Sequence, residues 1–488
     1  MRLPFDLIAV LLGLEALRKS YEIHLGALPT TQQMLAWGSA QNSSAEAAGA
    51  LAAYCLVVWL ANEALTRRTE WLTRFGSSPR GLPDSSGAPP RRHPLAMHAL
   101  GEAGLQACSV ALYLLILWHY RWPVKSSAWP EWLGLQGLPE PTLQMLRQSY
   151  FSGVLFDLGP FVLALMLGWV PKRRLAQGIR ARVIPLKKWL AFEAQMSFLP
   201  LLAYATFSLL SDLHFAARNY LPDAVREGLD NPWIMLPLNV LLLALFICVL
   251  TPWLVVRFWR CRPLQNGELK DRLQALLARS GVKARAILDW GPRGAGTLNA
   301  CVLGPWAPMR YVLIGPGLQE QLSLEECEAV VAHELGHARY GHLRLLIVLG
   351  IGVGSCVGLV WLLLAQASPM LQAAGCLVTA LLFICVLFGS VLRACEHEAD
   401  LASAELIGSP VPLANALEKV AVLAGDIREV DSWHHGTIAS RVEHLYREGL
   451  DSERSALYHK RVRRMRVAFM LFAALMAVAV IGFGWQAN

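Results

Sequence analysis

Two histidines four residues apart, with a glutamate between them, form the most chemically distinctive pattern in this sequence. His333, Glu334 and His337 make an HExxH motif. On a helix, positions four apart share a face, so both imidazoles can bind one zinc ion. Glu334 lies one residue along, close enough to take a proton from a water that the metal activates. The motif therefore predicts a hydrolytic metal centre.

A helix is expected to carry this motif, because Ser323 and Glu326 form a capping box ahead of an apolar-periodic run. His342 is the nearest candidate for a third ligand. On a continuous helix it would lie nine residues, or about 180°, from His333 and point away from the metal. We therefore interpret His342 as a polar residue at the helix end.

A second acidic pattern lies downstream, in the segment RACEHEAD at 393–400. Glu396 and Asp400 are four apart and share one helical face. One carboxylate can bind zinc while the other accepts a hydrogen bond from a ligating histidine. Glu398 lies about 160° from Asp400 and is poorly placed to join them. The alternative interpretation is a solvated acidic helix start after an apolar run.

The composition indicates a membrane protein. Of 488 residues, 55% are hydrophobic and only 16% are charged, whereas roughly a quarter of a soluble domain is charged. The net charge of +8 falls in short basic clusters between apolar runs, a pattern typical of membrane topology and not of nucleic-acid binding. The ten cysteines include no CxxC pair, so neither a disulfide framework nor a cysteine-based metal site is expected.

A transmembrane helix needs about 20 mostly apolar residues. The runs that qualify are 46–64, 96–118, 150–170, 189–210, 233–256, 344–366, 371–392 and 466–485. The shorter run Phe5–Leu17 is either a further span or an interfacial helix. The Lys- and Arg-rich segments all fall on one side under this assignment, and that side should be the cytoplasm. The active site is therefore expected to face the cytoplasm.

The order HExxH and then ExxAD resembles the signature of the M48 gluzincins. This family of zinc metalloproteases includes the Ste24 CAAX proteases and the HtpX quality-control proteases. The resemblance covers roughly 264–450. It implies one Zn²⁺ ion per chain, with Glu396 as its third ligand beside His333 and His337. It also implies that Asp400 supports the ligands from the second shell and that Glu334 is the general base.

Other segments are similar to the family pattern. Asn299 and Ala300 resemble its substrate-pairing strand, and Arg310–Ile314 resembles a second strand. His435 and Arg441 keep the spacing of an oxyanion-stabilising catalytic histidine and a structural or site arginine. Gly436 stands where the family often has proline, and ordinary surface positions are the alternative interpretation for both His435 and Arg441.

Together these features predict a mainly α, polytopic integral membrane protein of eight or nine transmembrane helices with a small gluzincin-type α/β metalloprotease domain. Residues 1–256 should form an N-terminal transmembrane region. Residues 257–450 should form the peptidase domain, including a transmembrane hairpin at about 344–392. Residues 451–488 should supply a basic segment and the final transmembrane helix. The expected location is the bacterial inner membrane or an equivalent membrane.

The expected function is a zinc-dependent endopeptidase that acts on protein or peptide substrates, including membrane-bound or lipidated ones. Membrane lipids are expected partners, and nucleic acid is not. Specific processing, as in Ste24, and clearance of damaged proteins, as in HtpX, both stay open. The alternative is a non-catalytic membrane scaffold with a structural zinc site, against which the intact Glu334 argues. A site-2-type intramembrane protease is disfavoured, because acidic residues at 325–328 precede the motif.

Overall fold

The computed structural model describes residues 44–75, 94–120, 149–180, 183–198, 249–290, 299–383, 388–432 and 435–486, with single residues and short stretches between 130 and 225. Helices dominate these residues, which confirms the mainly α prediction. The chain divides into two compact units, Met1–Ile247 and Cys248–Asn488. The second unit holds every residue of the predicted metal site.

Three long helices form most of the described part of the first unit. α3 (Ser44–Phe75) contacts both α4 (Pro94–His119) and α8 (Tyr150–Arg180), and α9 (Leu186–Ser197) packs on α8. Tyr54, Tyr113 and Leu158 are buried where α3, α4 and α8 meet. Such close packing, together with polar contacts between helices, holds helices together in an apolar solvent.

Five of the described helices are long and apolar enough to cross a membrane. These segments are Glu46–Thr73, Leu100–Leu117, Leu155–Gly178, His342–Leu363 and Ser452–Gly482. Each overlaps one of the predicted spans. The predicted run at 5–17 and most of 233–256 lie outside the described residues, and 189–210 and 371–392 are described only in part. The total of eight or nine spans therefore stays a prediction.

A small mixed sheet opens the second unit. Its strands are β1 (Arg262–Pro263), β2 (Ala286–Asp289), β3 (Ala300–Leu303) and β4 (Tyr311–Ile314), in the spatial order β1-β2-β4-β3. β2 and β4 are parallel, while β1 and β3 run antiparallel to their neighbours. Both strands expected from the sequence are present, and β3 forms an edge of the described sheet.

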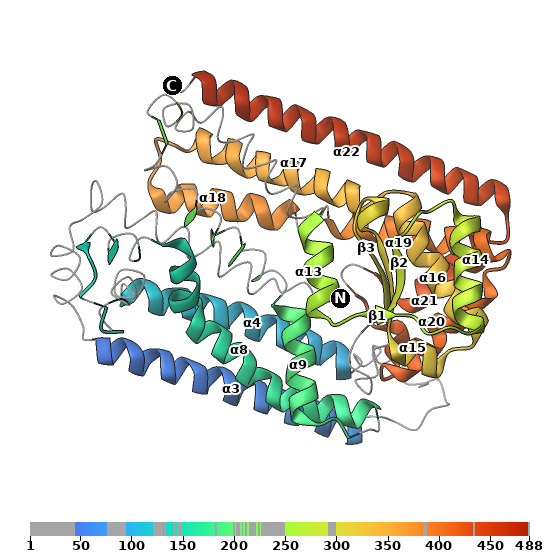
Figure 1. The fold of residues 1–488 in the computed structure, drawn as a ribbon, viewed down its shortest axis with the longest axis horizontal. Coiled ribbons are helices and arrows are strands. Elements are labelled where there is room, and N and C mark those ends of the chain that lie inside the picture. Colours follow the sequence, from blue (N-terminus) through green and yellow to red (C-terminus); the bar gives the residue numbers. More distant parts are fainter. Residues whose placement is uncertain are drawn as a thin grey trace, which may run out of the picture. The chain divides into compact units, whose positions relative to one another are not determined.

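Helices surround this sheet and continue into an apolar helical region (Figure 1). The helices of this unit are α13 (Thr251–Phe258), α14 (Glu268–Ser280), α15 (Pro316–Gln321), α16 (Leu324–Arg339), α17 (His342–Leu363), α18 (Pro369–Leu382), α19 (Gly389–Ile407), α20 (Val411–Leu423), α21 (Ile438–Glu448) and α22 (Ser452–Gln486), with short 3-10 turns at Ala307–Met309 and Ile427–Glu429. α17 contacts α18 and runs along α22.

The sheet supports the helix that carries the HExxH motif. Leu276 of α14, Ile314 of β4 and Leu335 of α16 are almost completely buried in one apolar cluster. Burying a large aliphatic side chain contributes about 1.5–3 kcal/mol. The apolar face of α16 is therefore fixed against α14 and the sheet, which leaves the histidine-bearing face toward α19.

Candidate metal centre

α16 begins at the capping box that the sequence predicts. The Ser323 hydroxyl accepts a hydrogen bond from the Glu326 backbone N–H, and the Glu326 carboxylate accepts one from the Ser323 N–H. Lys419 of α20 pairs with the same carboxylate at 2.7 Å. These contacts satisfy backbone donors that a helix start leaves unpaired. They fix where the helix begins and thus which face His333 and His337 occupy.

α16 and α19 approach each other closely beside the histidines. A Cβ atom on Gly336 would lie 2.9 Å from Ala402 Cβ and 3.1 Å from Ala399 Cα. Nearby, the buried Ser403 hydroxyl donates a 2.7 Å hydrogen bond to the Ala329 carbonyl. Small residues on both helices permit this approach, which brings Glu396 of α19 to the two histidines of α16.

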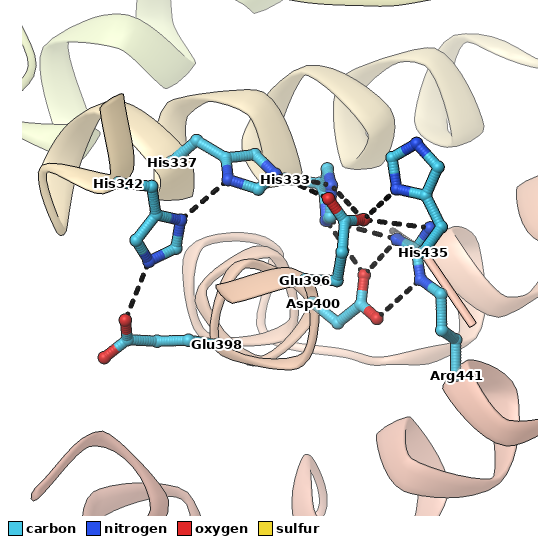
Figure 2. Close-up of polar contacts among 8 residues, drawn as sticks. All are labelled: His333, His337, His342, Glu396, Glu398, Asp400, His435 and Arg441. Carbon is cyan, nitrogen blue, oxygen red and sulfur yellow. Dashed lines mark hydrogen bonds and ion pairs between the residues drawn. The ribbon is translucent and has the colours of Figure 1, made fainter. Parts of the chain in front are cut away.

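His333, His337 and Glu396 converge on one point, as Figure 2 shows. The two histidine Nε2 atoms are 3.1 Å apart. Glu396 Oε2 lies 3.6 Å from His333 Nε2, and Glu396 Oε1 lies 3.5 Å from His337 Nε2. One possible ligand atom from each residue lies within 4.8 Å of the others. The geometry thus brings together the three residues expected to bind metal.

Asp400 and Arg441 support this group from behind. Asp400 Oδ1 lies 2.8 Å from His333 Nδ1, and the Arg441 guanidinium donates to both Asp400 carboxylate oxygens. Arg441 Nη1 also lies 3.2 Å from Glu396 Oε2. Burial would raise the pKa of Asp400, but the charge and hydrogen bonds of Arg441 hold it well below its usual range. Arg441 is buried, so it is not the surface residue of the alternative interpretation.

The position of His342 differs from the one that the sequence predicts. The interpretation of His342 as a helix-end residue that points away is wrong, because α16 and α17 are not continuous. Gly341 adopts a left-handed conformation with φ of +70°, and α17 starts at His342. The break turns His342 inward, where its Nδ1 lies 2.7 Å from His337 Nδ1 and its Nε2 lies 2.8 Å from Glu398 Oε2 (Figure 2).

The signal for this break is Gly341 itself, since glycine in the left-handed region commonly ends a helix. Glu398 was expected not to join Glu396 and Asp400, and it does point elsewhere, toward His342. Its side chain is fully buried. His342 and Glu398 are therefore two buried polar residues beside the site whose contacts the sequence did not predict.

Glu334 occupies the position between the two histidines on α16. Burial raises its pKa to about 7; the positive charge of a protonated His333 opposes this rise, and the negative charge of Glu396 adds to it. Burial also lowers the pKa of His337 well below its usual value. For Glu396, burial would raise the pKa, but Arg441 and His435 keep it well below its usual value.

His435 lies at the solvent side of the group. Its Nδ1 is 2.9 Å from Glu396 Oε2, and its side chain is 42% exposed. The neighbouring Gly436 has a φ of +69°, which proline cannot adopt because its ring fixes φ near −65°. The departure from the family pattern at Gly436 therefore reflects a different local backbone, which still places His435 beside Glu396.

Asn299 and Ala300 lie at the start of the edge strand. Ala300 is the first residue of β3, and the Asn299 carbonyl accepts a hydrogen bond from the Gly315 N–H at 2.8 Å. β3 contacts α16. Ala300 thus opens the strand that contacts the HExxH helix, and Asn299 directly precedes it.

The arrangement fits a zinc ion. With Nδ1–H of His333 donated to Asp400, and Nδ1–H of His337 donated to His342, both Nε2 lone pairs point to the same place. The two carboxylate oxygens of the buried Glu396 face these Nε2 atoms, with Oε1 toward His337 and Oε2 toward His333. Two imidazole nitrogens and a carboxylate form a three-ligand set that zinc uses in catalytic sites.

Comparisons with known proteins agree with this geometry. Residues 263–459 match the model of peptidase family M48. A protease HtpX homolog of Bacteroides fragilis is 30% identical over 182 residues, covering 33% of this chain and 55% of the relative. Protease HtpX homolog 1 of Sulfolobus acidocaldarius is 33% identical over 150 residues, covering 27% of this chain and 48% of the relative. The chain thus spans about half the length of these curated relatives.

A solved structure shares the fold. The crystal structure of S. mikatae Ste24p matches with a TM-score of 0.51 at 17% sequence identity, covering 81% of this chain and 98% of that chain. HExxH, the downstream Glu396 and the matched segment all lie in the second unit. Residues 263–459 of this chain are therefore similar to peptidase family M48, a family of metalloproteases.

Proposed function

We propose that this protein is a membrane-embedded, zinc-dependent endopeptidase that hydrolyses peptide bonds in membrane-associated proteins or peptides. The observation that carries the proposal is the convergence of His333, His337 and Glu396, with one possible ligand atom from each within 4.8 Å of the others. A structural zinc site usually has four protein ligands, whereas a catalytic site has three and an open position. In the described part of the chain the group has three members.

The chain's own residues divide the work of hydrolysis. When bound, zinc supplies a Lewis acid that polarises the scissile carbonyl and activates a water. His333, His337 and Glu396 would hold the ion. Glu334, on the same helix and not in the ligand group, takes the proton of the attacking water and passes it to the leaving amine. His435, which is partly open to solvent, stabilises negative charge on the substrate oxygen.

The edge strand β3 is the proposed substrate-binding element. In the described sheet β3 pairs with β4 on one side only. An extended peptide can add to such an edge through backbone hydrogen bonds. Asn299 and Ala300 lie at the start of this strand and beside α16, so a peptide there would lie along the helix that carries the HExxH motif.

The substrates are proposed to be proteins or peptides at the membrane, including lipidated ones. Five described helices are apolar enough to span a bilayer, which supports a multi-pass integral protein. The one-sided distribution of Lys and Arg supports an active site that faces the cytoplasm. Mass-spectrometric comparison of membrane proteins in cells with the wild type and with Glu334→Gln would separate specific processing from broad clearance.

The decisive experiment measures zinc content and cleavage together. Purified Glu334→Gln should keep one zinc per chain and lose about 10²–10⁴-fold of the activity on a casein-type substrate, because it removes the proton acceptor and no ligand. Glu328→Gln is the matched control, since Glu328 lies on the same helix but pairs with Arg279 at 2.9 Å. Zinc binding without cleavage by the wild type would favour the scaffold alternative instead.

A further inference from the structure

The two histidines of the metal group are supported in different ways. His333 Nδ1 meets the Asp400 carboxylate directly at 2.8 Å. His337 Nδ1 meets another imidazole, His342 Nδ1, at 2.7 Å, and the far nitrogen of that ring meets Glu398 at 2.8 Å (Figure 2). His337 thus reaches a carboxylate through an intervening ring.

His337, His342 and Glu398 form a series of hydrogen bonds, and the partners in this series fix where the protons lie. An ionised Glu398 only accepts hydrogen bonds, so His342 Nε2 carries a proton and donates it. In a neutral His342, Nδ1 is then the acceptor, and it accepts from His337 Nδ1–H. This leaves the lone pair of His337 Nε2 pointing at the metal position. The series therefore selects both the ring orientation and the tautomer that a ligand needs.

Both His342 and Glu398 are buried. The His342 and Glu398 side chains are only 3% and 0% exposed. A buried carboxylate must be paired to be tolerated. Two residues of α22 provide this pairing, with His459 Nδ1 at 3.2 Å and Arg466 Nη2 at 3.1 Å from Glu398 Oε1. Residues from four helices, α16, α17, α19 and α22, therefore meet at this support of one ligand.

We propose that His342 and Glu398 are positioning residues that orient His337 for metal binding, and that α22 holds Glu398 in place for this task. The inference rests on the proposed zinc site. It also gives the helix break at Gly341 a function, because the break turns His342 toward His337. It also makes the C-terminal helix a part of the metal centre, although α22 contributes no ligand.

Zinc affinity measured by competition with a chromophoric chelator tests the inference directly. His342→Leu should bind zinc about 10–100-fold more weakly than the wild type, the range found when outer-shell partners are removed. It should also alter the visible spectrum of the Co²⁺-loaded protein, which reports ligand geometry. His342→Asn should stay close to the wild type, because its amide oxygen can still accept from His337 Nδ1–H. Thermal unfolding checks that each variant is folded.

Glu405→Gln is the matched control. Glu405 lies on α19 and contacts His459 and Ser455 of α22, so it ties the same helices without touching His342. Its zinc affinity should be unchanged. Equal losses of zinc affinity in Glu405→Gln and His342→Leu would overturn the proposal. Equal losses in His342→Asn and His342→Leu would do the same, because His342 would then affect zinc binding only through packing.

If His342→Leu does not fold, Glu398→Gln provides a second test of the same inference. This nearly isosteric change should weaken zinc binding about tenfold, near the lower end of the same range. Unchanged affinity in a folded Glu398→Gln or His342→Leu would overturn the inference while leaving the proposed function intact. Failure of the wild type to bind zinc would instead refute the proposed function.

Discussion

The support of His333 and the support of His337 come from different parts of the second unit. Asp400 and Arg441 lie on α19 and α21, helices of the polar peptidase region. His342 is the first residue of α17, and Glu398 is paired by α22; both α17 and α22 are apolar enough to cross a membrane. The difference shows that one ligand depends on the peptidase helices alone, whereas the other also depends on helices that are apolar enough to cross a membrane.

The two supports also differ in the number of contacts between the histidine and its carboxylate. Asp400 holds His333 through one contact and is itself fixed by two hydrogen bonds from Arg441. His337 is held through two contacts in series, so small displacements of either can add. We therefore expect changes on the Asp400 side to weaken zinc binding more than changes on the Glu398 side.

The largest expected loss of zinc affinity comes from removing Glu396, the ligand that faces both histidines. Glu396→Ala removes the carboxylate that faces both histidines, so zinc affinity should fall by more than the roughly 100-fold upper limit of outer-shell effects. Metal analysis after dialysis measures this. Glu398→Ala is the control two residues away and should retain zinc at reduced affinity. The reverse pattern of zinc content would overturn the assignment of Glu396.

Removal of Asp400 should have the next largest effect. Asp400→Ala deletes the acceptor of His333 and leaves Arg441 buried without its main partner, so zinc affinity should fall toward the upper end of the 10–100-fold range. Breaking a buried pair also costs about 3–5 kcal/mol of stability. The double variant Asp400→Ala with Arg441→Gln should recover stability but not zinc affinity. A smaller loss of affinity than in His342→Leu would contradict the expected order of the two supports.

Gly336→Ala tests a feature common to both supports, the close approach of α16 and α19. The added methyl group would lie within 3.1 Å of Ala399 and Ala402, and such overpacking costs about 1–3 kcal/mol. Zinc affinity should fall roughly tenfold as Glu396 moves away from the histidines. Gly350→Ala is the control, because a Cβ there meets nothing within 4 Å. Normal zinc affinity and melting temperature in Gly336→Ala would show that the approach is not needed.

The smallest expected effect is at the far end of the His337 support. Arg466→Gln removes one of the partners of Glu398 but leaves His459 and His342 in place. Partly exposed ion pairs contribute about 0.2–1 kcal/mol, so zinc affinity should fall about fivefold or less. Arg464→Gln, an exposed position on the same helix, should have no effect. A loss as large as that of Asp400→Ala would mean that α22 is the dominant support.

The spacing of residues along the chain predicted the part of the site that holds His333 and Glu396. The capping box at Ser323, the shared face of His333 and His337, and the shared face of Glu396 and Asp400 all follow from helix periodicity. Arg441 was placed only through the family resemblance. No periodicity connects α21 to α19, since tertiary packing brings them together.

The other side of the site was missed for two physical reasons. The angle assigned to His342 assumed an unbroken helix, and a single residue with positive φ, Gly341, invalidates that assumption. The partners of Glu398 come from α22, more than 60 residues downstream, where the sequence indicates only a basic segment before an apolar run. Buried pairing between distant helices leaves no local signal.

The break at Gly341 also limits how far the active site can be from the bilayer. His342, where α17 begins, is the fifth residue after His337, and a fully extended chain of five residue steps spans at most about 18 Å. With α17 crossing the membrane, the ion would be held near the level of the lipid head groups. A scissile bond must then come to the membrane surface to be cut. For an anchored substrate, the length of chain between its anchor and the scissile bond would decide which bonds are within reach.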